Sequence, residues 1–292
     1  MISITECEAI SKYILEYLDN NSKTVKISES ELTQTAEKVA NHLYNSVLKD
    51  KFELVYQPKF ESDEKTTKSA EVLFRTKESV FIRPDVAFQL FKEYGFEKEV
   101  LHKQLERVGK DLSMFTASFG NDYQVSINVA ISLLDKDFCK KLDSVLNKNG
   151  LQYNNIQIEI LETENFDELK NHKEVISFLK SKGVKFAIDD YGSRNADKTV
   201  FDKMTFDVVK IDMNITKHAN KINDYAEIEK IYNEAKEHNP NVTVVVEGVE
   251  DSRDTTKLKA IGKMTYQGYK FSKPIPAMDV VENFSPNSMG MN

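Results

Sequence analysis

Two adjacent aspartates stand where an apolar stretch of the chain ends. The run 184–188, apolar apart from Lys185, leads directly into Asp189 and Asp190, and Gly192 follows two residues later. Neighbouring like charges repel, and each carboxylate resists losing its water. Asp and Gly also form ordinary turns, so a solvated turn after a strand would account for this stretch by itself. The other interpretation is a divalent metal site, because adjacent carboxylates can share a hard cation.

Polar or charged residues recur within, or just after, other apolar runs. Taken singly, each has an ordinary interpretation: Glu159 as a surface residue of a half-exposed strand, Lys210 as a solvated charge at a strand end, and Glu247 as part of a capping turn. Burying a charge costs on the order of several kcal/mol unless it is paired or ligated, so this many need a common cause. The residues are Glu71, Asn128, Glu159, Asp189, Asp190, Lys210, Glu247 and Gln267.

The candidate ligands are all oxygen donors. None of the five histidines falls on a strand candidate, and a set without His or Cys selects Mg2+ or Mn2+ over zinc or copper. The acids are too many for one ion, so we expect two metals, with Asp189 as the candidate bridge. Two metals close together suit in-line attack on a phosphate ester. The expected ligands are Glu71, Asn128, Glu159, Asp189, Asp190 and Glu247.

Short apolar or β-rich runs alternate with amphipathic stretches after residue 50, which predicts an α/β fold, a (β/α)8 TIM-like barrel. The link 61–69 is polar and lacks helical periodicity, so the first two strands should form a hairpin and one strand should run antiparallel. In such a barrel the strand ends converge on one face, where the polar residues would meet. The strand candidates are 52–60, 70–75, 123–131, 156–162, 185–191, 206–212, 242–250 and 264–271, and helical stretches include 137–150, 166–183, 223–240 and 254–263.

Helical spacing also marks the first part of the chain. Apolar residues recur at that spacing over 10–17 and 32–43, so we expect a short N-terminal helical segment, 1–48, that serves in packing. The barrel domain would then cover 49–285, and 286–292 would form a tail.

Composition limits the classes of partner and compartment. The net charge of -7 argues against a nucleic-acid polymer as partner. The two cysteines, Cys7 and Cys139, lie far apart without metal-site spacing, which fits a reducing compartment. The start of the chain is acidic where a signal peptide is basic, and no run is long enough for a membrane span. We therefore expect a cytoplasmic protein without membrane insertion.

Eight motifs, in order over about residues 50–280, resemble those of the EAL domain family, the bacterial cyclic di-GMP phosphodiesterases. The name motif E-A-L-x-R is similar to EVLFR at 71–75, and D-D-F-G is similar to DDYG at 189–192. The others are YQP at 56–58, SIN at 126–128, IEILE at 158–162, KID at 210–212, EGVE at 247–250 and QGYKFSKPIP at 267–276. The family fold is a barrel with one reversed strand.

The resemblance implies hydrolysis of cyclic di-GMP to linear pGpG with Mg2+ or Mn2+, and a homodimer. It implies one ion held by Glu71, Asn128, Glu159 and Asp189, and a second held by Asp189, Asp190 and Glu247. It also implies that Lys210 contacts the attacking water, that Gln267 supports the site, and that Glu162 partners the loop after Asp190. Arg75 would bind a substrate phosphate, and the substrate side would include Gln57, Asp212 and Glu250.

The chain departs from the family pattern at three places. Val72 replaces the alanine of the name motif, and Leu161 stands where threonine is usual. The loop 193–197 reads SRNAD, where the family usually has T-G-Y-S-S. This loop supports an alternative function, in which a catalytically weak or inactive EAL domain acts as a cyclic di-GMP receptor or protein-interaction module. A third possibility is hydrolysis of another phosphodiester, such as pGpG.

Overall fold

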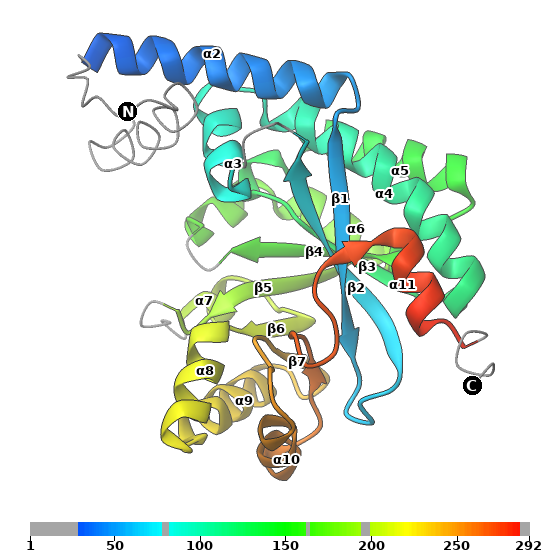
Figure 1. Cartoon of the computed structure of the whole chain (residues 1–292), viewed down its shortest axis with the longest axis vertical. Coiled ribbons are helices and arrows are strands. Elements are labelled where there is room, and N and C mark those ends of the chain that lie inside the picture. Colours follow the sequence, from blue (N-terminus) through cyan, green and yellow to red (C-terminus); the bar gives the residue numbers. More distant parts are fainter. Residues whose placement is uncertain (1–28, 78–81, 162–163, 194–198, 287–292) are drawn as a thin grey trace, which may run out of the picture. The chain divides into compact units, whose positions relative to one another are not determined.

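The structure, a computed structural model, describes residues 29–77, 82–161, 164–193 and 199–286 (Figure 1). The expected helix at 10–17 and the tail residues 287–292 lie outside the described residues. Within the described part of the chain, no helix combines the length and the apolar character that crossing a bilayer requires.

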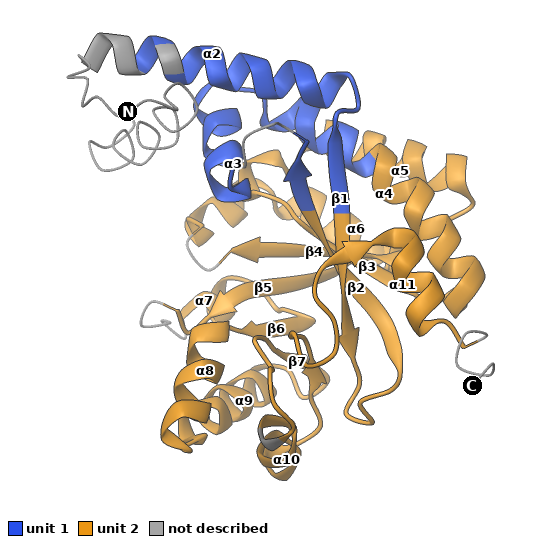
Figure 2. Cartoon of the chain, in the orientation of Figure 1, with its two compact units in different colours: residues 1–54, 74–105 blue, residues 55–73, 106–292 orange. Residues whose placement is uncertain are grey.

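The chain divides into two compact units (Figure 2). Unit 1 comprises Met1–Leu54 and Phe74–Leu105, and unit 2 comprises Val55–Leu73 and Glu106–Asn292. The division passes through three elements that have residues in both units, namely β1 (Phe52–Phe60), β2 (Thr67–Thr76) and α4 (Glu97–Phe119). The domain boundary expected near residue 48 stays a prediction.

A closed barrel of eight strands is the centre of the fold, as predicted. Neighbouring strands follow the order β2-β3-β4-β5-β6-β7-β8-β1, and pairing of β1 with β2 closes the ring. The strands are β1 (Phe52–Phe60), β2 (Thr67–Thr76), β3 (Gln124–Asn128), β4 (Ile156–Leu161), β5 (Lys185–Tyr191), β6 (Val208–Ile211), β7 (Thr243–Val246) and β8 (Thr265–Tyr266), with an added edge strand β9 (Ile275–Pro276).

Strand β1 is the one reversed strand, as the short polar link predicted. It pairs antiparallel with β8, where Phe60 lies opposite Tyr266, whereas β2 through β8 pair in parallel. The link to β2 closes as a tight turn, in which Asp63 accepts hydrogen bonds from the backbone amides of Lys65 and Thr66, both at 2.9 Å. Because β1 and β2 run in opposite directions, they need no crossover helix.

Helices connect the parallel strands. Gly150 ends α5 (Lys136–Asn149) and Gly183 ends α6 (Lys173–Lys182), both in the left-handed conformation, whereas Gly262 follows α10 (Ser252–Ile261) without a positive φ. In Figure 1, α8, α9 and α10 lie together beside β5–β7. The helices of unit 2 are α5 (Lys136–Asn149), α6 (Lys173–Lys182), α7 (Thr199–Lys203), α8 (Met213–Ile222), α9 (Ala226–His238), α10 (Ser252–Ile261) and α11 (Ala277–Phe284), with short 3-10 turns at Ile131–Leu133, Tyr153–Asn155 and Phe166–Asn171.

Unit 1 has its own apolar packing around three helices. Helix α2 (Glu29–Leu48) buries Ala36, Ala40 and Leu43, which follows the predicted helical spacing. Tyr44 stacks on Phe96 with ring centroids 4.2 Å apart. The other helices are α3 (Pro84–Glu93) and the first part of α4 (Glu97–Phe119).

The barrel strands are buried on both faces, which is why they read as continuous apolar runs. All four residues of β6 are buried, including Lys210, and Val244, Val245 and Val246 of β7 are buried as well. A charged side chain at a buried position of such a strand has no route to bulk water. The polar residues at these positions must therefore pair with one another or with a ligand.

Candidate metal centre

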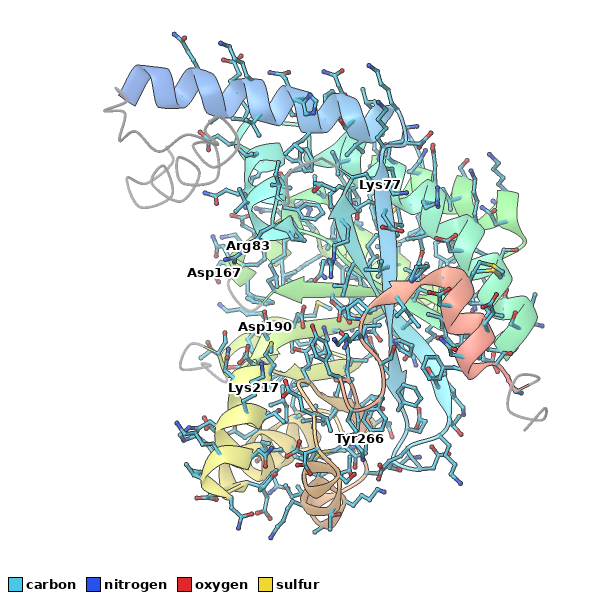
Figure 3. All side chains as sticks on the ribbon, viewed as in Figure 1. Lys77, Arg83, Asp167, Asp190, Lys217 and Tyr266 are labelled. Atoms are coloured by element: carbon cyan, nitrogen blue, oxygen red, sulfur yellow. The ribbon has the colours of Figure 1, made fainter. Side chains whose placement is uncertain are left out.

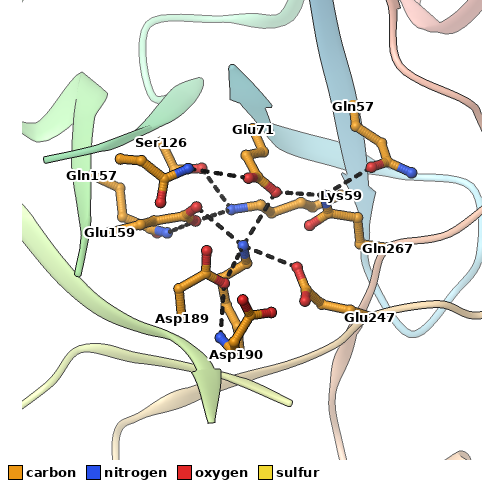
Figure 4. Close-up of polar contacts among 12 residues, drawn as sticks. Gln57, Lys59, Glu71, Ser126, Gln157, Glu159, Asp189, Asp190, Glu247 and Gln267 are labelled. Carbon is orange, nitrogen blue, oxygen red and sulfur yellow. Dashed lines mark hydrogen bonds and ion pairs between the residues drawn. The ribbon is translucent and has the colours of Figure 1, made fainter. Parts of the chain in front are cut away.

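The polar residues noted in the sequence meet at the carboxyl ends of the barrel strands (Figure 4). Glu159 in β4 and Lys210 in β6 are both fully buried. Glu247 directly follows β7, and Gln267 directly follows β8. A network of hydrogen bonds and ion pairs joins these side chains to Glu71 of β2. The structure therefore brings these residues together, and their roles stay predictions.

A bulge in β5 explains how two consecutive aspartates reach one site. Successive side chains of a regular strand point to opposite faces. Here the pairing with β6 shifts register between Ile188 and Tyr191, and Asp190 adopts φ 55°, in the left-handed region. That conformation costs a residue other than glycine roughly 1 kcal/mol, although Asp tolerates it better than most residues. The strain brings the Asp190 carboxylate to the same side as that of Asp189.

Two groups of acids share Asp189. Carboxylate oxygens of Glu71, Glu159 and Asp189 all lie within 4.8 Å of one another, and so do those of Asp189, Asp190 and Glu247. Asn128 is linked to the first group, since its Nδ2 lies 3.4 Å from Glu71 Oε1. Hard-donor sets of this kind match the preference of Mg2+ or Mn2+ for oxygen. The residues therefore fit divalent ions, and Asp189 belongs to both groups.

Lys210 lies among four of these acids. Its Nζ is 2.6 Å from Asp189 Oδ1, 2.9 Å from Glu247 Oε1, 3.0 Å from Glu159 Oε2 and 3.1 Å from Glu71 Oε2. An ammonium group has only three N–H donors, so some of these contacts are ion pairs without a hydrogen bond of their own. Burial lowers the pKa of Lys210, but attraction to the four carboxylates outweighs it and raises that pKa well above its usual value.

Gln267 fixes the position of Glu71. Its Nε2 donates to Glu71 Oε2 at 2.7 Å and to Gln57 Oε1 at 3.1 Å, and Gln57 in turn donates to the carbonyl of Ser272. Within the described structure, the buried Oε1 of Gln267 has no hydrogen-bond partner. An unpaired buried acceptor beside two acid groups is suited to a water or a ligand that enters the site.

Three residues that contact the centre were not identified as site residues from the sequence: Lys59, Ser126 and Gln157. Lys59 of β1 is buried and donates to Ser126 Oγ and to Glu159 Oε1, each at 2.7 Å. Gln157 of β4 donates to the same Glu159 oxygen at 3.0 Å. The period-2 spacing from Gln57 to Lys59 was the available signal, because it places both side chains on one face of the strand.

Other expected site residues have different partners. Asp212 caps α8 by accepting from the backbone amide of Asn214 at 2.7 Å. Burial raises the pKa of Asp190, and the charge of Asp212 adds to that rise. Glu250 is exposed and lies 3.5 Å from Lys217 of α8, which is labelled in Figure 3. Arg75 belongs to unit 1, where it donates to the carbonyl of Phe74. Glu162 and the loop residues 194–197 lie outside the described residues.

Comparison with known proteins identifies the family. A family model described as EAL domain matches residues 40–274, which is most of the chain. The chain belongs to the EAL domain family.

Curated relatives of this EAL domain are similar over most of its length. The chain is 27% identical over 229 residues to the protein named probable cyclic di-GMP phosphodiesterase PdeI of Escherichia coli, covering 76% of this chain and 29% of PdeI. It is 26% identical over 275 residues to cyclic di-GMP phosphodiesterase PdeA of Borreliella burgdorferi, covering 91% of this chain and 40% of PdeA. The chain thus spans 29% to 40% of the length of these two relatives.

Solved EAL structures share the fold. EAL enzyme Bd1971 in a cAMP-bound form gives a TM-score of 0.79 at 21% identity, covering 97% of this chain and 76% of that chain. The PaMucR phosphodiesterase in complex with c-di-GMP gives a TM-score of 0.74 at 19% identity, covering 83% of this chain and 99% of that chain. At such identities the likeness concerns the fold alone.

The acids of this EAL domain differ in pKa because their surroundings differ. Burial raises the pKa of Asp189 well above its usual value, and it raises that of Glu247 to about 7. Burial would also raise the pKa of Glu159, but Lys210 and Lys59 lower it to about 2. Burial therefore favours the protonated forms of Asp189 and Glu247, whereas the two lysines favour the ionised form of Glu159.

The raised pKa of Glu247 predicts a pH dependence of stability in EDTA. A carboxyl with a folded pKa of about 7 and an ordinary value of 4.5 favours folding below pH 4.5, and that contribution is lost as the pH rises through about 7. Between about pH 5 and pH 8, we expect the melting temperature of Glu247→Gln to decrease less than that of the parent protein. Thermal unfolding in EDTA at several pH values measures this. Glu282→Gln, at an exposed position of α11, is the control, and parallel curves for Glu247→Gln and the parent would contradict the prediction.

Proposed function

We propose that this chain is a metal-dependent phosphodiesterase that hydrolyses cyclic di-GMP to linear pGpG. The observation that carries the proposal is the pair of acid groups, one buried and one partly buried, that share Asp189 beside the ammonium of Lys210. Membership of the EAL domain family supports the choice of substrate, since relatives of the family are named cyclic di-GMP phosphodiesterases. The compartment proposed is the cytoplasm, and the assembly proposed is a homodimer.

Glu71, Asn128, Glu159 and Asp189 would hold one Mg2+ or Mn2+ ion, and Asp189, Asp190 and Glu247 would hold the other. Such ions supply Lewis acidity toward phosphate oxygens and lower the pKa of water. The donor set supports this assignment, because every group in it offers oxygen and the two acid groups overlap at one residue.

The protein's own groups would position the reactants. Lys210, with its raised pKa, stays protonated and can donate a hydrogen bond to the attacking water while it offsets charge on the phosphate. Gln267 keeps Glu71 in place and offers its unpaired Oε1 to a water. Arg75 would bind a phosphate, and Gln57, Asp212 and Glu250 would contact the rest of the substrate. Glu162 would support the loop that begins after Asp190.

The first test is the dependence of turnover on divalent ions. We expect the pure protein to convert cyclic di-GMP to pGpG with Mg2+ or Mn2+, to stop in excess EDTA, and to be inhibited by Ca2+, whose looser coordination suits in-line attack poorly. Chromatographic separation of the products measures this. Binding of cyclic di-GMP without any product would instead favour the receptor function, and undiminished turnover in EDTA would overturn the metal centre.

Substitutions test the roles of single residues. We expect Glu71→Ala, Asp189→Asn and Lys210→Ala each to reduce turnover by at least about a hundredfold, because each removes a ligand or the one cation that touches four acids. In EDTA, Lys210→Ala should also melt earlier than the parent, since its acids lose that cation. Asp189→Asn should not, because it relieves repulsion between carboxylates.

The matched control for these variants is Asp143→Asn, which changes an exposed carboxylate of α5 that accepts from Tyr153 and Asn147. Circular dichroism establishes that each variant is folded before its turnover is compared. Turnover near the parent rate in any of the three site variants would show that the role assigned to that residue is wrong.

A further inference from the structure

Lys59 is a second buried lysine at the centre, and the proposed chemistry gives it no role. Its side chain is only 2% exposed, and it extends from the reversed strand β1 to side chains of β3 and β4. Its Nζ lies 2.7 Å from Ser126 Oγ and 2.7 Å from Glu159 Oε1 (Figure 4). The contact is therefore with one particular oxygen of a candidate metal ligand.

The two carboxylate oxygens of Glu159 have different surroundings. Oε1 accepts from Lys59 at 2.7 Å and from Gln157 at 3.0 Å, which uses both of its lone pairs. Oε2 accepts from Lys210 at 3.0 Å, and Lys210 also touches Glu71 and Asp189 of the same acid group. Oε2 is thus the oxygen that faces the other acids of the group. Lys59 and Gln157 thus leave Glu159 one oxygen to offer to an ion.

The number of oxygens that a carboxylate offers affects which ion binds. Ca2+ takes six to eight oxygen ligands and readily accepts carboxylates through both oxygens, whereas Mg2+ demands a compact octahedral set. A glutamate held to one oxygen therefore favours the smaller ion. If Oε1 were released, Glu159 could rotate and offer both oxygens, which would help Ca2+ more than Mg2+.

We propose that Lys59, together with Gln157, is a positioning residue that restricts Glu159 to one-oxygen ligation and so biases the centre toward Mg2+ and Mn2+ against Ca2+. This inference rests on the proposed function, because it takes Glu159 as a metal ligand. Lys59 does not touch the reacting atoms and acts only through Glu159. A purely structural role would instead have Lys59 offset charge, which affects all divalent ions alike.

The test is the ratio of Mg2+ affinity to Ca2+ affinity, measured by isothermal titration calorimetry on the chelated and dialysed protein. Lys59→Met keeps most of the side-chain volume and removes the charge and the donors. Loss of its positive charge should strengthen the binding of every divalent ion, and the ratio cancels that effect. We expect the ratio to fall on the order of tenfold in Lys59→Met and to stay near the parent value in Lys59→Arg, which retains N–H donors.

Two further variants keep the test decisive. Gln157→Met removes the other donor to Oε1 without changing charge, so the ratio should fall there as well, even if Lys59→Met does not fold. Lys185→Met is the matched control, because Lys185 lies in β5 and donates to Gln124 at 3.1 Å, apart from the acids. Its ratio should equal that of the parent.

Each outcome has a distinct meaning. An unchanged ratio in both Lys59→Met and Gln157→Met overturns this inference and leaves the two-ion proposal standing. Absence of any divalent binding by the parent protein overturns the proposed centre, and this inference with it. If Asp189→Asn abolishes the heat of ion binding, the titrated ions bind at Asp189, the residue that both acid groups share.

Discussion

The crowding of negative charge at one end of the barrel is the constraint on which the site depends. Five carboxylates, those of Glu71, Glu159, Asp189, Asp190 and Glu247, face the two ammonium groups of Lys59 and Lys210. Full ionisation would leave a net charge of about -3 in surroundings that water barely enters. Burial opposes this charge, because it raises the pKa of Asp189 well above its usual value and the pKa of Glu247 to about 7.

Specific features of the backbone bring these carboxylates together. Parallel strands bring their carboxyl ends to one edge, so residues distant in the sequence converge there without long loops. The β5 bulge and the left-handed Asp190 add a second carboxylate from a strand that would otherwise supply one. The reversed strand β1 supplies Lys59 and Gln57, which hold Glu159 directly and Glu71 through Gln267. The reversed strand thus supplies side chains that position the candidate metal ligands, rather than further ligands.

Much of the fold and the site could be predicted, because buried parallel strands read as apolar runs and polar residues stand out in them. The eight strands and the meeting of Glu71, Glu159, Asp189 and Glu247 followed from this contrast, and the hairpin followed from the short polar link between the first two strands. Lys59 was missed because lysine usually marks a surface position. Asp212 and Glu250 were expected at the substrate through family resemblance, whereas locally one caps a helix and the other pairs with an exposed lysine. Helix α8 was not predicted, since 213–222 is short and carries polar residues throughout.

The energetic cost of this cluster favours a role in ligand binding over a role in stabilising the fold. Apolar residues of similar volume would pack the end of a barrel without the desolvation that buried charges require, and such replacements are often neutral or stabilising. The strained φ of Asp190 adds a further cost. A fold that only needed stability could do without both features. The acid cluster and the strained backbone meet at Asp189 and Asp190, beside a lysine that contacts four acids. Cations between the two acid groups would explain why these features occur together. The same interaction that destabilises the empty site would then supply its affinity, since each repelling carboxylate gains a counter-charge on binding.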